Sequence, residues 1–494
     1  MSRQHPSLPT QRSPAALPSE KSTASFWHTA PSPLLTGHRS TRELPKSADV
    51  VIIGSGMSGT SAAYHLLAAP TDGASNHSGT GLEVVMLEAR EACWGATGRN
   101  GGHCQPLLFE TPTDASIGEF ELKNFHTLQD LIEDRDIDCE FVAQPGVRAI
   151  YSEHHLQEAE QALSIMDTTA PHLRRLMTLV TDKAELEKYR VQTAQAAIVT
   201  SIAARMWPYK FVAHMLEFLL AAPGDQLAGA LNLQALAPAT AIARSQTDQD
   251  RPWSITTPRG AVAARAVILA TNAYTSHLLP EFADLIVPCR GQMSALRPLP
   301  SLRRDGRLKT SLGFLGDGLD DYLVQRPSAS GGHLMFGGGR QHGESVGATD
   351  DSVLDPATAA YLRRRLVAAL SLPEGQGPAA SDVAFEAAAE WTGIMGFSRD
   401  ERPWVGAVPD REGVFVAAGF TGHGMPNTWL CGKAAALMAA GASEEAAGRE
   451  TGLPECYRLS RGRMERAKAA RSGEEKDWAA LARGEGKEES VLGT

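Results

Sequence analysis

The stretch Asp49-Val50-Val51-Ile52-Ile53-Gly54-Ser55-Gly56-Met57-Ser58-Gly59 decides which fold we expect. Its apolar first half predicts a buried strand, and the residues that follow, up to about Leu67, predict a helix. Between them, Gly54 would form a tight turn, Gly56 would let a pyrophosphate approach the backbone, and Gly59 would let helix and strand pack closely. The first N–H groups of that helix have no partners within it and would point at phosphate oxygens. Residues 54–59 are therefore predicted to bind a dinucleotide.

An acidic residue at the end of the next apolar run supports this prediction. Residues 82–87 are expected to form a second strand, after which Glu88 would receive the ribose hydroxyls of an adenosine. Glu88 lies farther from the glycines than the usual spacing of about 20 residues. The polar segment 70–81 explains the difference, and we expect it to be an inserted surface loop. An acid here, with no Arg placed for a 2′-phosphate, argues against an NADP-type ribose. The alternative is a solvated residue at a strand end.

Length, charge and cysteine content limit the functional classes. The 494 residues suggest two or three domains. The formal charge of −10, without a basic stripe, argues against nucleic acid as a partner, and no run of about 18 apolar residues predicts a membrane span. The six cysteines lack CxxC spacing, so we expect neither a metal site nor a disulfide framework. Reduced thiols favour a cytoplasmic location.

Both ends of the chain have the composition of appendages. Residues 1–45 are rich in Ser, Pro, Thr and Arg and are expected to form a flexible N-terminal segment. A Ser- and Arg-rich composition is also typical of a transit peptide, so an organellar location is the alternative. Residues 443–494, densely charged from about Ser460, are expected to form a charged C-terminal tail.

Two further glycine-rich segments follow strands or strand ends. In residues 95–103, small side chains would let backbone amides approach a flat or anionic group, and Arg99 could neutralise a phosphate. Residues 414–424 repeat the strand–glycine–helix pattern, and the helix N-terminus would stabilise an anionic ring system. His423, between two glycines, would be exposed to a ligand. The alternative for this histidine is a purely structural role.

Together these segments carry a family resemblance. The chain resembles the D-amino-acid oxidase superfamily of FAD-dependent oxidoreductases, and within it the branch that holds sarcosine oxidase, glycine oxidase and gamma-glutamylputrescine oxidase. The resemblance covers about residues 48–442 and rests on residues 54–59, 87–90, 95–103, 270–274, 288–292 and 419–425. It implies an α/β fold in which a Rossmann-like FAD-binding domain is interleaved with an α+β substrate domain containing a mixed or antiparallel sheet. The expected FAD-binding domain comprises residues 46–110, 225–292 and 385–442, and the substrate domain comprises residues 111–224 and 293–384.

The resemblance also implies which residues bind the cofactor. The glycines of residues 54–59 would hold the FAD pyrophosphate, Glu88 would hold the adenosine ribose, and residues 419–425 would lie at the N1/O2 edge of the flavin. The complete set of expected cofactor contacts is Gly54, Ser55, Gly56, Met57, Ser58, Gly59, Glu88, Ala89, Arg90, Ala96, Thr97, Arg99, Asn100, Gly101, Gly102, His103, Ala239, Arg290, Gly419, Gly422, His423, Gly424 and Met425.

Three departures from the family pattern bear on the chemistry. Relatives of the sarcosine oxidase kind tether the flavin through a Cys in the segment that corresponds to residues 391–400, which has none here, so we expect non-covalent FAD. Those relatives also place a Lys near the flavin to assist oxygen reduction. The nearest counterpart is Arg340, which leaves the electron acceptor as oxygen or an unknown species. No clear counterpart of the substrate-carboxylate arginine is evident, and Arg340, Arg399 and Arg402 are the candidates.

The expected reaction is oxidation of the C–N bond of a small-molecule amine or amino acid by hydride transfer to flavin N5, followed by hydrolysis of the imine. His103 and His423 are the predicted catalytic contributors. Trp391 and Arg340 are the predicted substrate contacts, although Trp391 could equally belong to the core. The alternatives are an FAD-dependent dehydrogenase of a non-amine substrate and a non-catalytic FAD-binding protein.

Overall fold

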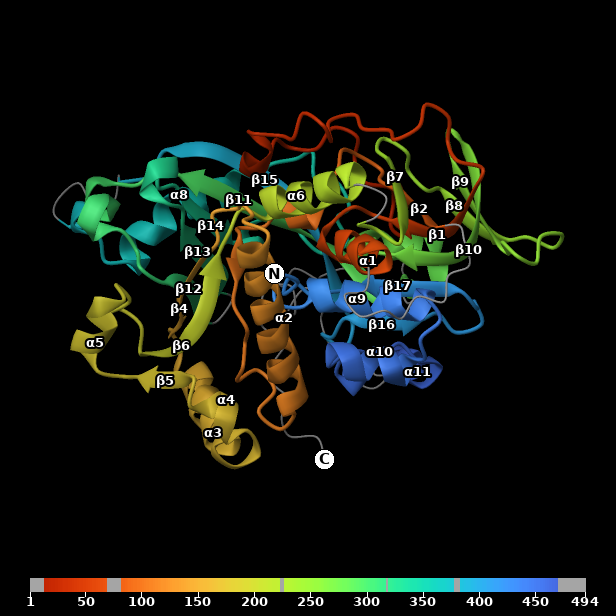
Figure 1. Cartoon of the computed structure of the whole chain (residues 1–494). Helices are drawn as coiled ribbons and strands as arrows, with labels where there is room; N and C mark the ends of the chain where they lie inside the picture. The colour runs from red at the N-terminus through yellow and green to blue at the C-terminus, as the bar shows by residue number, and fades with distance from the viewer. Residues whose placement is uncertain (1–12, 69–80, 223–225, 317–318, 377–382, 470–494) are drawn as a thin grey trace, which may run out of the picture.

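Two β-sheets organise the chain, with the first sheet at the right of Figure 1 and the second at the left. The computed structural model describes residues 13–68, 81–222, 226–316, 319–376 and 383–469. The strands of the first sheet are β1 (Ser47–Ile53), β2 (Leu82–Leu87), β7 (Gly229–Gln234), β8 (Ala241–Arg244), β9 (Trp253–Thr257), β10 (Gly260–Leu269), β16 (Trp404–Ala407) and β17 (Val414–Ala418). The strands of the second sheet are β3 (His103–Cys104), β4 (Val142–Ile150), β5 (Met177–Val180), β6 (Ala196–Arg205), β11 (Ile286–Leu296), β12 (Ser311–Gly316), β13 (Leu319–Gln325), β14 (Leu334–Gly338) and β15 (Ala387–Ser398).

The first sheet has the order β16-β17-β10-β1-β2-β7, and its central strands are parallel. The helices α1 (Met57–Leu67), α6 (Pro208–Ala221) and α9 (Thr428–Ala439) share a hydrophobic core with Val50 and Ile52 of β1. Val51 and Ile53 pack into a second core on the opposite face. A strand covered on both faces needs apolar side chains throughout, which explains the unbroken apolar run. The predicted strand–turn–helix is confirmed.

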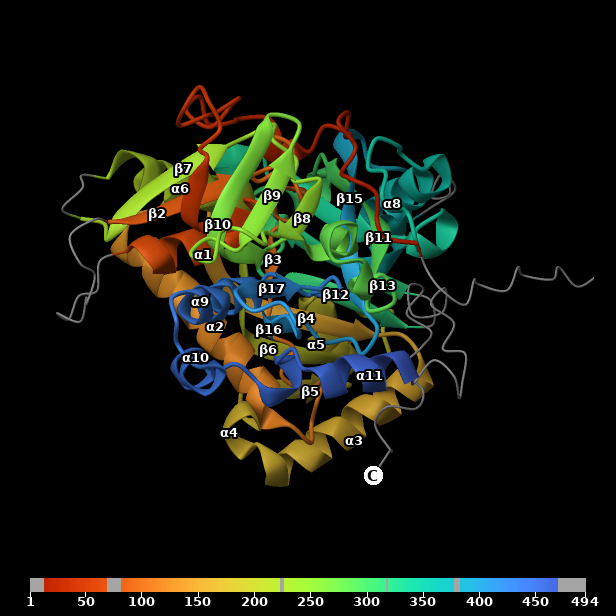
Figure 2. The same cartoon turned by 90° about the vertical axis from the view of Figure 1, so that its right-hand side faces the viewer.

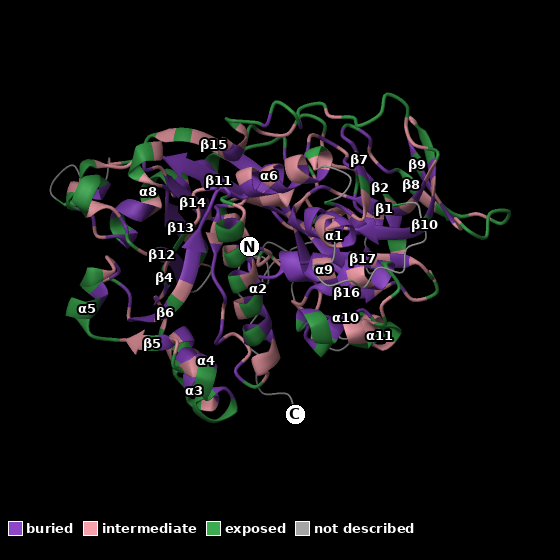
Figure 3. Cartoon of the chain, in the orientation of Figure 1, coloured by how far each residue is buried: buried purple, intermediate pink, exposed green. Residues whose placement is uncertain are grey.

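The second sheet has the order β15-β11-β14-β13-β12-β4-β6-β3 and is antiparallel except for the parallel pair β4–β12. The predicted mixed or antiparallel sheet is therefore confirmed. The remaining helices are α2 (Ala115–Asp134), α3 (Glu153–Thr169), α4 (Pro171–Arg174), α5 (Lys183–Lys188), α7 (Thr275–Leu278), α8 (Pro356–Ala369), α10 (Glu444–Thr451) and α11 (Arg461–Ala469). Figure 3 shows both sheets largely buried, whereas α3, α5 and the tip of the β8–β9 hairpin are exposed. Among the described helices, none is both long enough and apolar enough to cross a membrane.

The two sheets divide the chain differently from the predicted domain boundaries at three elements. Strands β11 and β15 pair with each other in the second sheet, although residues 286–292 and 387–398 were expected in the FAD-binding domain. Helix α6 packs against α1 in the core of the first sheet, although it falls within the expected substrate domain. The apolar pattern of a buried strand or helix does not reveal which of two cores receives it. The predicted insertion at residues 70–81 lies almost entirely outside the described residues.

The expectation of a flexible segment over residues 1–45 is wrong for residues 13–45. Trp27 and Leu35 are 1% exposed and belong to the same core as α1. Trp27 lies in a short 3₁₀ helix, η1 (Phe26–His28), and its Nε1 donates a hydrogen bond to the carbonyl of Asn100. The Ser- and Pro-rich composition hid a few large apolar anchors, which are enough to hold an extended chain on a surface. Residues 1–12 lie outside the described part.

The expectation of a tail from residue 443 is wrong up to residue 469. Helices α10 and α11 pack against the body of the molecule (Figure 2). The Arg463 guanidinium is buried, donates to Asp400 at 2.8 Å and lies 3.7 Å from the centroid of the Trp404 ring. Arg463 therefore anchors α11, a helix with many charged residues, to the body of the molecule. Residues 470–494 are outside the described part.

Helix α1, which packs on the first sheet, contains a histidine that makes stability depend on pH. His65 of α1 has Nδ1 2.8 Å from the Ser61 carbonyl and packs on the Trp429 ring. Burial lowers the pKa of His65 from 6.5 to about 4, against the raising effect of the Ser61 hydrogen bond. Because the folded pKa is the lower one, its contribution to stability is complete above pH 6.5 and is lost as the pH falls toward 4.

We therefore expect His65→Gln to flatten the acid limb of the stability profile by about 1 kcal/mol per pH unit at most. The measurement is thermal or denaturant unfolding between pH 7 and 4. His154→Gln, at a half-exposed position on α3, is the matched control and should leave the slope unchanged. An unaltered slope in His65→Gln would show that this histidine does not gain a proton on unfolding.

Candidate active site

A continuous cavity of about 1690 Å³ is lined by residues of both sheets. One end is formed by residues 53–58 and Glu88, and the other by His103, Tyr322 and His423. Sites for drug-sized ligands are usually about 300–1,000 Å³. The cavity therefore has room for an extended dinucleotide and for a substrate beside it.

The glycine turn (Gly54–Gly59) links β1 to α1 at the first end of this cavity. Gly54 has φ +103°, and a Cβ there would lie 2.6 Å from the Ala270 carbonyl oxygen. A Cβ on Gly59 would lie 1.9 Å from the Gly54 carbonyl oxygen, so only glycine allows this approach of helix and strand. Gly56 is the N-cap of α1, provides no side-chain cap, and lines the cavity. The first turn of α1 thus opens toward the cavity, as an anion site requires.

Glu88 lies at the carboxyl end of β2, beside the glycine turn. Its Oε2 accepts hydrogen bonds from Ser55 N at 3.0 Å and Ser55 Oγ at 2.6 Å, and its Oε1 accepts one from Arg90 N at 2.9 Å. Oε1 has a further lone pair, whereas both lone pairs of Oε2 are used by Ser55, and the side chain lines the cavity while only 8% exposed. Ala239, which follows β7, lines the same end. These contacts hold the carboxylate where ribose hydroxyls can donate to it.

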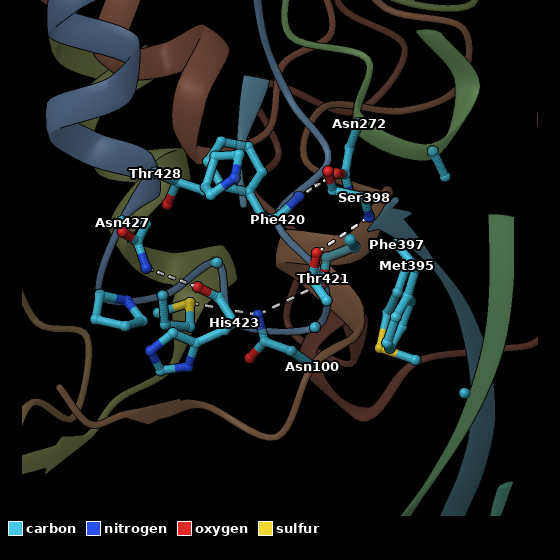
Figure 4. A pocket seen from close by; sticks show the side chains of 18 of the residues that line it. Asn100, Asn272, Met395, Phe397, Ser398, Phe420, Thr421, His423, Asn427 and Thr428 are labelled. Carbon is cyan, nitrogen blue, oxygen red and sulfur yellow. Dashed lines mark hydrogen bonds between the residues drawn. The ribbon is translucent and has the colours of Figure 1, made fainter. Parts of the chain in front are cut away.

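The loop between β17 and α9 forms the other end of the cavity (Figure 4). Gly419 N donates to Asn272 Oδ1 at 3.0 Å, and Ser398 N donates to Thr421 Oγ1 at 3.1 Å. Asn427 Nδ2 donates to the His423 carbonyl at 3.0 Å. This loop is therefore held from the first sheet, from β15 and from its own helix. Gly422, His423 and Gly424 of this loop line a wall of fixed shape.

His423 has a buried carboxylate partner that the sequence did not reveal. Its Nε2 lies 3.0 Å from Oε1 of Glu121 on α2, whose side chain is 3% exposed. Glu121 also accepts hydrogen bonds from Asn427 Nδ2 at 3.0 Å and from Leu107 N at 2.8 Å. The contact between His423 and Glu121 lacks hydrogen-bond geometry, so Glu121 acts on the His423 ring through the proximity of its carboxylate. The sequence signal that could have revealed this role is the position of Glu121, an acidic residue beside Phe120 on the buried face of α2.

His103 lies on the same wall in a very different state. Burial lowers the pKa of His103 to about 3, and the charges of His423 and Arg148 lower it further. Its ring stacks on Tyr322 with centroids 6.0 Å apart, and its Nε2 has no hydrogen-bond partner among the described residues. His103 is therefore a neutral imidazole near neutral pH. It can exchange hydrogen bonds with a ligand, but it does not supply a positive charge.

Arg340 stands on the substrate side of the cavity, directly after β14. Its side chain is 7% exposed, pairs with Asp320, and lies 4.8 Å from the Phe397 ring centroid. Burial lowers the pKa of Arg340 to about 10, so the guanidinium remains charged at neutral pH. Within the described structure its Nη1 has no hydrogen-bond partner. The guanidinium is thus paired through Nη2 with Asp320, and its buried Nη1 is left to donate to an anionic group of a ligand.

Two arginines expected to follow the pyrophosphate are occupied by the protein. Arg90 Nη1 lies 2.8 Å and Arg99 Nε lies 3.4 Å from Oδ2 of Asp351, which is fully buried. Arg99 also donates to the carbonyls of Thr392 and Thr23. Both arginines still line the cavity, and the prediction that Arg99 neutralises a phosphate stays a prediction. The pairing needs Asp351 from the loop before α8, which no local pattern indicates.

Four other predicted contacts lie away from the cavity. The Arg290 guanidinium donates to the carbonyls of Glu344 and Asp350 outside the cavity wall. Trp391 is fully buried in the core, where its Nε1 donates to the Arg99 carbonyl at 2.7 Å, so its predicted substrate role is wrong. Gly102 and Gly419 have positive φ and turn the chain behind the wall. The remaining predicted residues line the cavity, except Gly59, which packs α1 on β1 as predicted.

Comparison with known families agrees with this geometry. The family described as FAD dependent oxidoreductase matches residues 49–438. The chain belongs to this family.

Individual relatives show the same likeness. The chain is 23% identical over 421 residues to gamma-glutamylputrescine oxidoreductase of Escherichia coli (strain K12), covering 81% of this chain and 85% of that protein. Its fold is similar to glycine oxidase from Geobacillus kaustophilus, with a TM-score of 0.62, 20% identity and coverage of 84% and 99% of the two chains. L-proline dehydrogenase from P. horikoshii is similar with a TM-score of 0.61, 18% identity and coverage of 84% and 97%.

The cofactor is FAD, and the residues present fit it. The glycine turn and the open first turn of α1 suit its pyrophosphate, and Glu88 suits its ribose. The 1690 Å³ cavity continues from there to the wall formed by His103 and His423. None of the six cysteines lines this cavity. That arrangement supports the prediction of non-covalent FAD.

Proposed function

We propose that this protein oxidises the C–N bond of an amine or amino acid to an imine, which water then hydrolyses. The observation that carries the proposal is the buried Nη1 of Arg340, which has no hydrogen-bond partner among the described residues. It lies in the same cavity as the wall formed by His103 and His423. It provides a cationic site for a substrate carboxylate. The named activities of the similar proteins, on gamma-glutamylputrescine, glycine and L-proline, support an amine or amino-acid substrate.

The two electrons and one proton of the C–H bond leave as hydride to FAD, which supplies the acceptor N5. The protein binds the substrate as a neutral amine, whose lone pair assists hydride loss. Tyr322 contributes to the wall that would face the substrate, and its hydroxyl accepts a hydrogen bond from Gly101 N at 2.7 Å. The neutral His103 offers the amine a hydrogen-bond acceptor without a competing charge.

The His423–Glu121 pair would act at the other side of the ring. His423, whose Nε2 lies 3.0 Å from the buried Glu121 carboxylate, would face negative charge that develops on the cofactor and help to stabilise it. The N-terminus of α9 follows in the same loop and adds its partial positive charge. In this role His423 touches the cofactor, and Glu121 is a positioning residue.

The experiment is an anaerobic screen of amines and amino acids against the purified holoenzyme, with bleaching of the flavin absorbance as the readout. Rapid bleaching by at least one amine is expected. A hydroxy acid and glycerol 3-phosphate serve as controls for oxidation at a C–O bond. Bleaching by one of these controls alone would contradict the proposal, as would the absence of reduction by any amine.

Oxygen as electron acceptor and a cytoplasmic location are parts of the same proposal. The six cysteines, all among the described residues, form no disulfide with one another, and five of them are buried, which supports a reducing compartment. Peroxide formation in air at the rate of anaerobic flavin reduction would support an oxidase. Turnover only with an artificial acceptor would identify a dehydrogenase.

A further inference from the structure

Residues 15–28, here called the N-terminal strap, cross the carboxyl ends of three strands of the first sheet. Ala15 N donates to Ser276 Oγ at 2.9 Å, just beyond the end of β10. Farther along, the Ser19 carbonyl lies 3.5 Å from Nη1 of Arg90, just beyond the end of β2. Because β1 lies between β10 and β2, the strap passes over the end of β1. The glycine turn lies at that end. The N-terminal part of the described chain is red in Figure 1.

Between these two anchors the strap contributes side chains to the cavity. Leu17 and Pro18 are half-buried and line the same cavity as the glycine turn and Glu88. Their neighbours Ala16 and Glu20 are exposed. The strap thus presents an apolar wall toward the site and a solvated face away from it. A ligand on the glycine turn would be enclosed between this wall and the sheet.

The next residues of the strap are fixed by Arg99, by the loop that holds Asp351, and by β15 of the second sheet. Arg99 Nη2 donates to the Thr23 carbonyl at 2.8 Å, and Thr23 N donates to the Asp351 carbonyl at 2.8 Å. Thr392 N, on β15, donates to Thr23 Oγ1 at 2.9 Å. The buried Asp351 carboxylate pairs with both Arg99 and Arg90 at this junction. Opening the strap here would leave the Thr23 partners without their hydrogen bonds, so this junction keeps the strap closed.

We propose that the N-terminal strap is a wall of the FAD site, in which Leu17 and Pro18 close the cavity over the ADP half of the cofactor. Release of FAD then requires these residues to move aside. The strap therefore governs how long the cofactor stays bound. This proposal rests on the cofactor alone and is independent of the substrate.

The test compares two double variants of the strap. Leu17→Gly/Pro18→Gly removes the apolar wall, whereas Ala16→Gly/Glu20→Gly adds the same two glycines at exposed positions. The rate of FAD dissociation is measured by the rise of flavin fluorescence after dilution of each holoenzyme. The first variant should release FAD at least tenfold faster than the wild type, and the second within about threefold of it. Circular dichroism of the apoproteins checks that both variants fold.

Amide hydrogen exchange of the wild type provides a second readout that does not depend on a variant. Residues 15–23 should exchange more slowly in the holoprotein than in the apoprotein, because a bound FAD blocks opening of the strap. Equal FAD dissociation from the two variants would overturn the proposal. Identical exchange of residues 15–23 with and without FAD would also overturn it.

Discussion

A Gly56→Val variant is expected to fold and to lose FAD. Gly56 has φ −70°, an ordinary value for an L-residue, so the substitution introduces no backbone strain. A Cβ there would lie 3.1 Å from Thr97 Oγ1, on the wall of the cavity. The valine methyl groups would occupy the space through which a pyrophosphate reaches the N–H groups of α1. We expect FAD to bind at least about 100-fold more weakly, which corresponds to about 2.7 kcal/mol.

The measurement is the flavin content of the purified variant, together with titration of the apoprotein with FAD. Gly462→Val adds the same atoms to α11, away from the cavity, and should retain FAD. Gly59→Val is unsuitable because its Cβ would meet the Gly54 carbonyl oxygen at 1.9 Å and disturb the fold itself. A Gly56→Val protein that remains yellow would refute the assignment of the glycine turn to the pyrophosphate.

The dinucleotide half of this molecule could be predicted because its determinants are local. The turn at Gly54, the close approach at Gly59 and the acid after β2 all lie within residues 54–88. Each has one chemical reason to occur at its position. The resemblance extended this local pattern to the fold, and the two sheets agree with it.

The substrate half could not be predicted to the same extent because distant segments assemble it. Glu121 meets Asn427, which lies 306 positions along the chain, and Asp351 meets Arg90 from 261 positions away. A charge that is buried by such a pairing leaves no periodic signal. Arg99 and Trp391 illustrate the opposite difficulty. Both residue types are suited to a ligand site, but their hydrogen-bond and ion-pair partners are buried protein groups. The N-terminal strap escaped prediction because Trp27 anchors a segment of disorder-like composition.

An Arg340→Met variant is expected to lose affinity for amino acids while it keeps FAD. Methionine preserves the apolar contact with the Phe397 ring but removes the positive charge of the guanidinium from the cavity. A substrate carboxylate would then be buried without a partner, at a cost of about 2–5 kcal/mol. We expect KM for the best amino acid of the screen to rise by about 100-fold. The limiting rate of flavin reduction should change much less, because the reacting carbon is not bound through this group.

Two comparisons make this prediction specific to the carboxylate. An amine that lacks a carboxylate should show less than a threefold change in KM in Arg340→Met. Arg297→Met, which breaks an exposed ion pair with Glu386 at the end of β11, should leave KM unchanged for both substrates. If KM for the amino acid stays within threefold of the wild-type value, Arg340 does not bind the carboxylate. Arg399 and Arg402, which also line the cavity, would then be tested in the same way, because the cavity must still neutralise that charge.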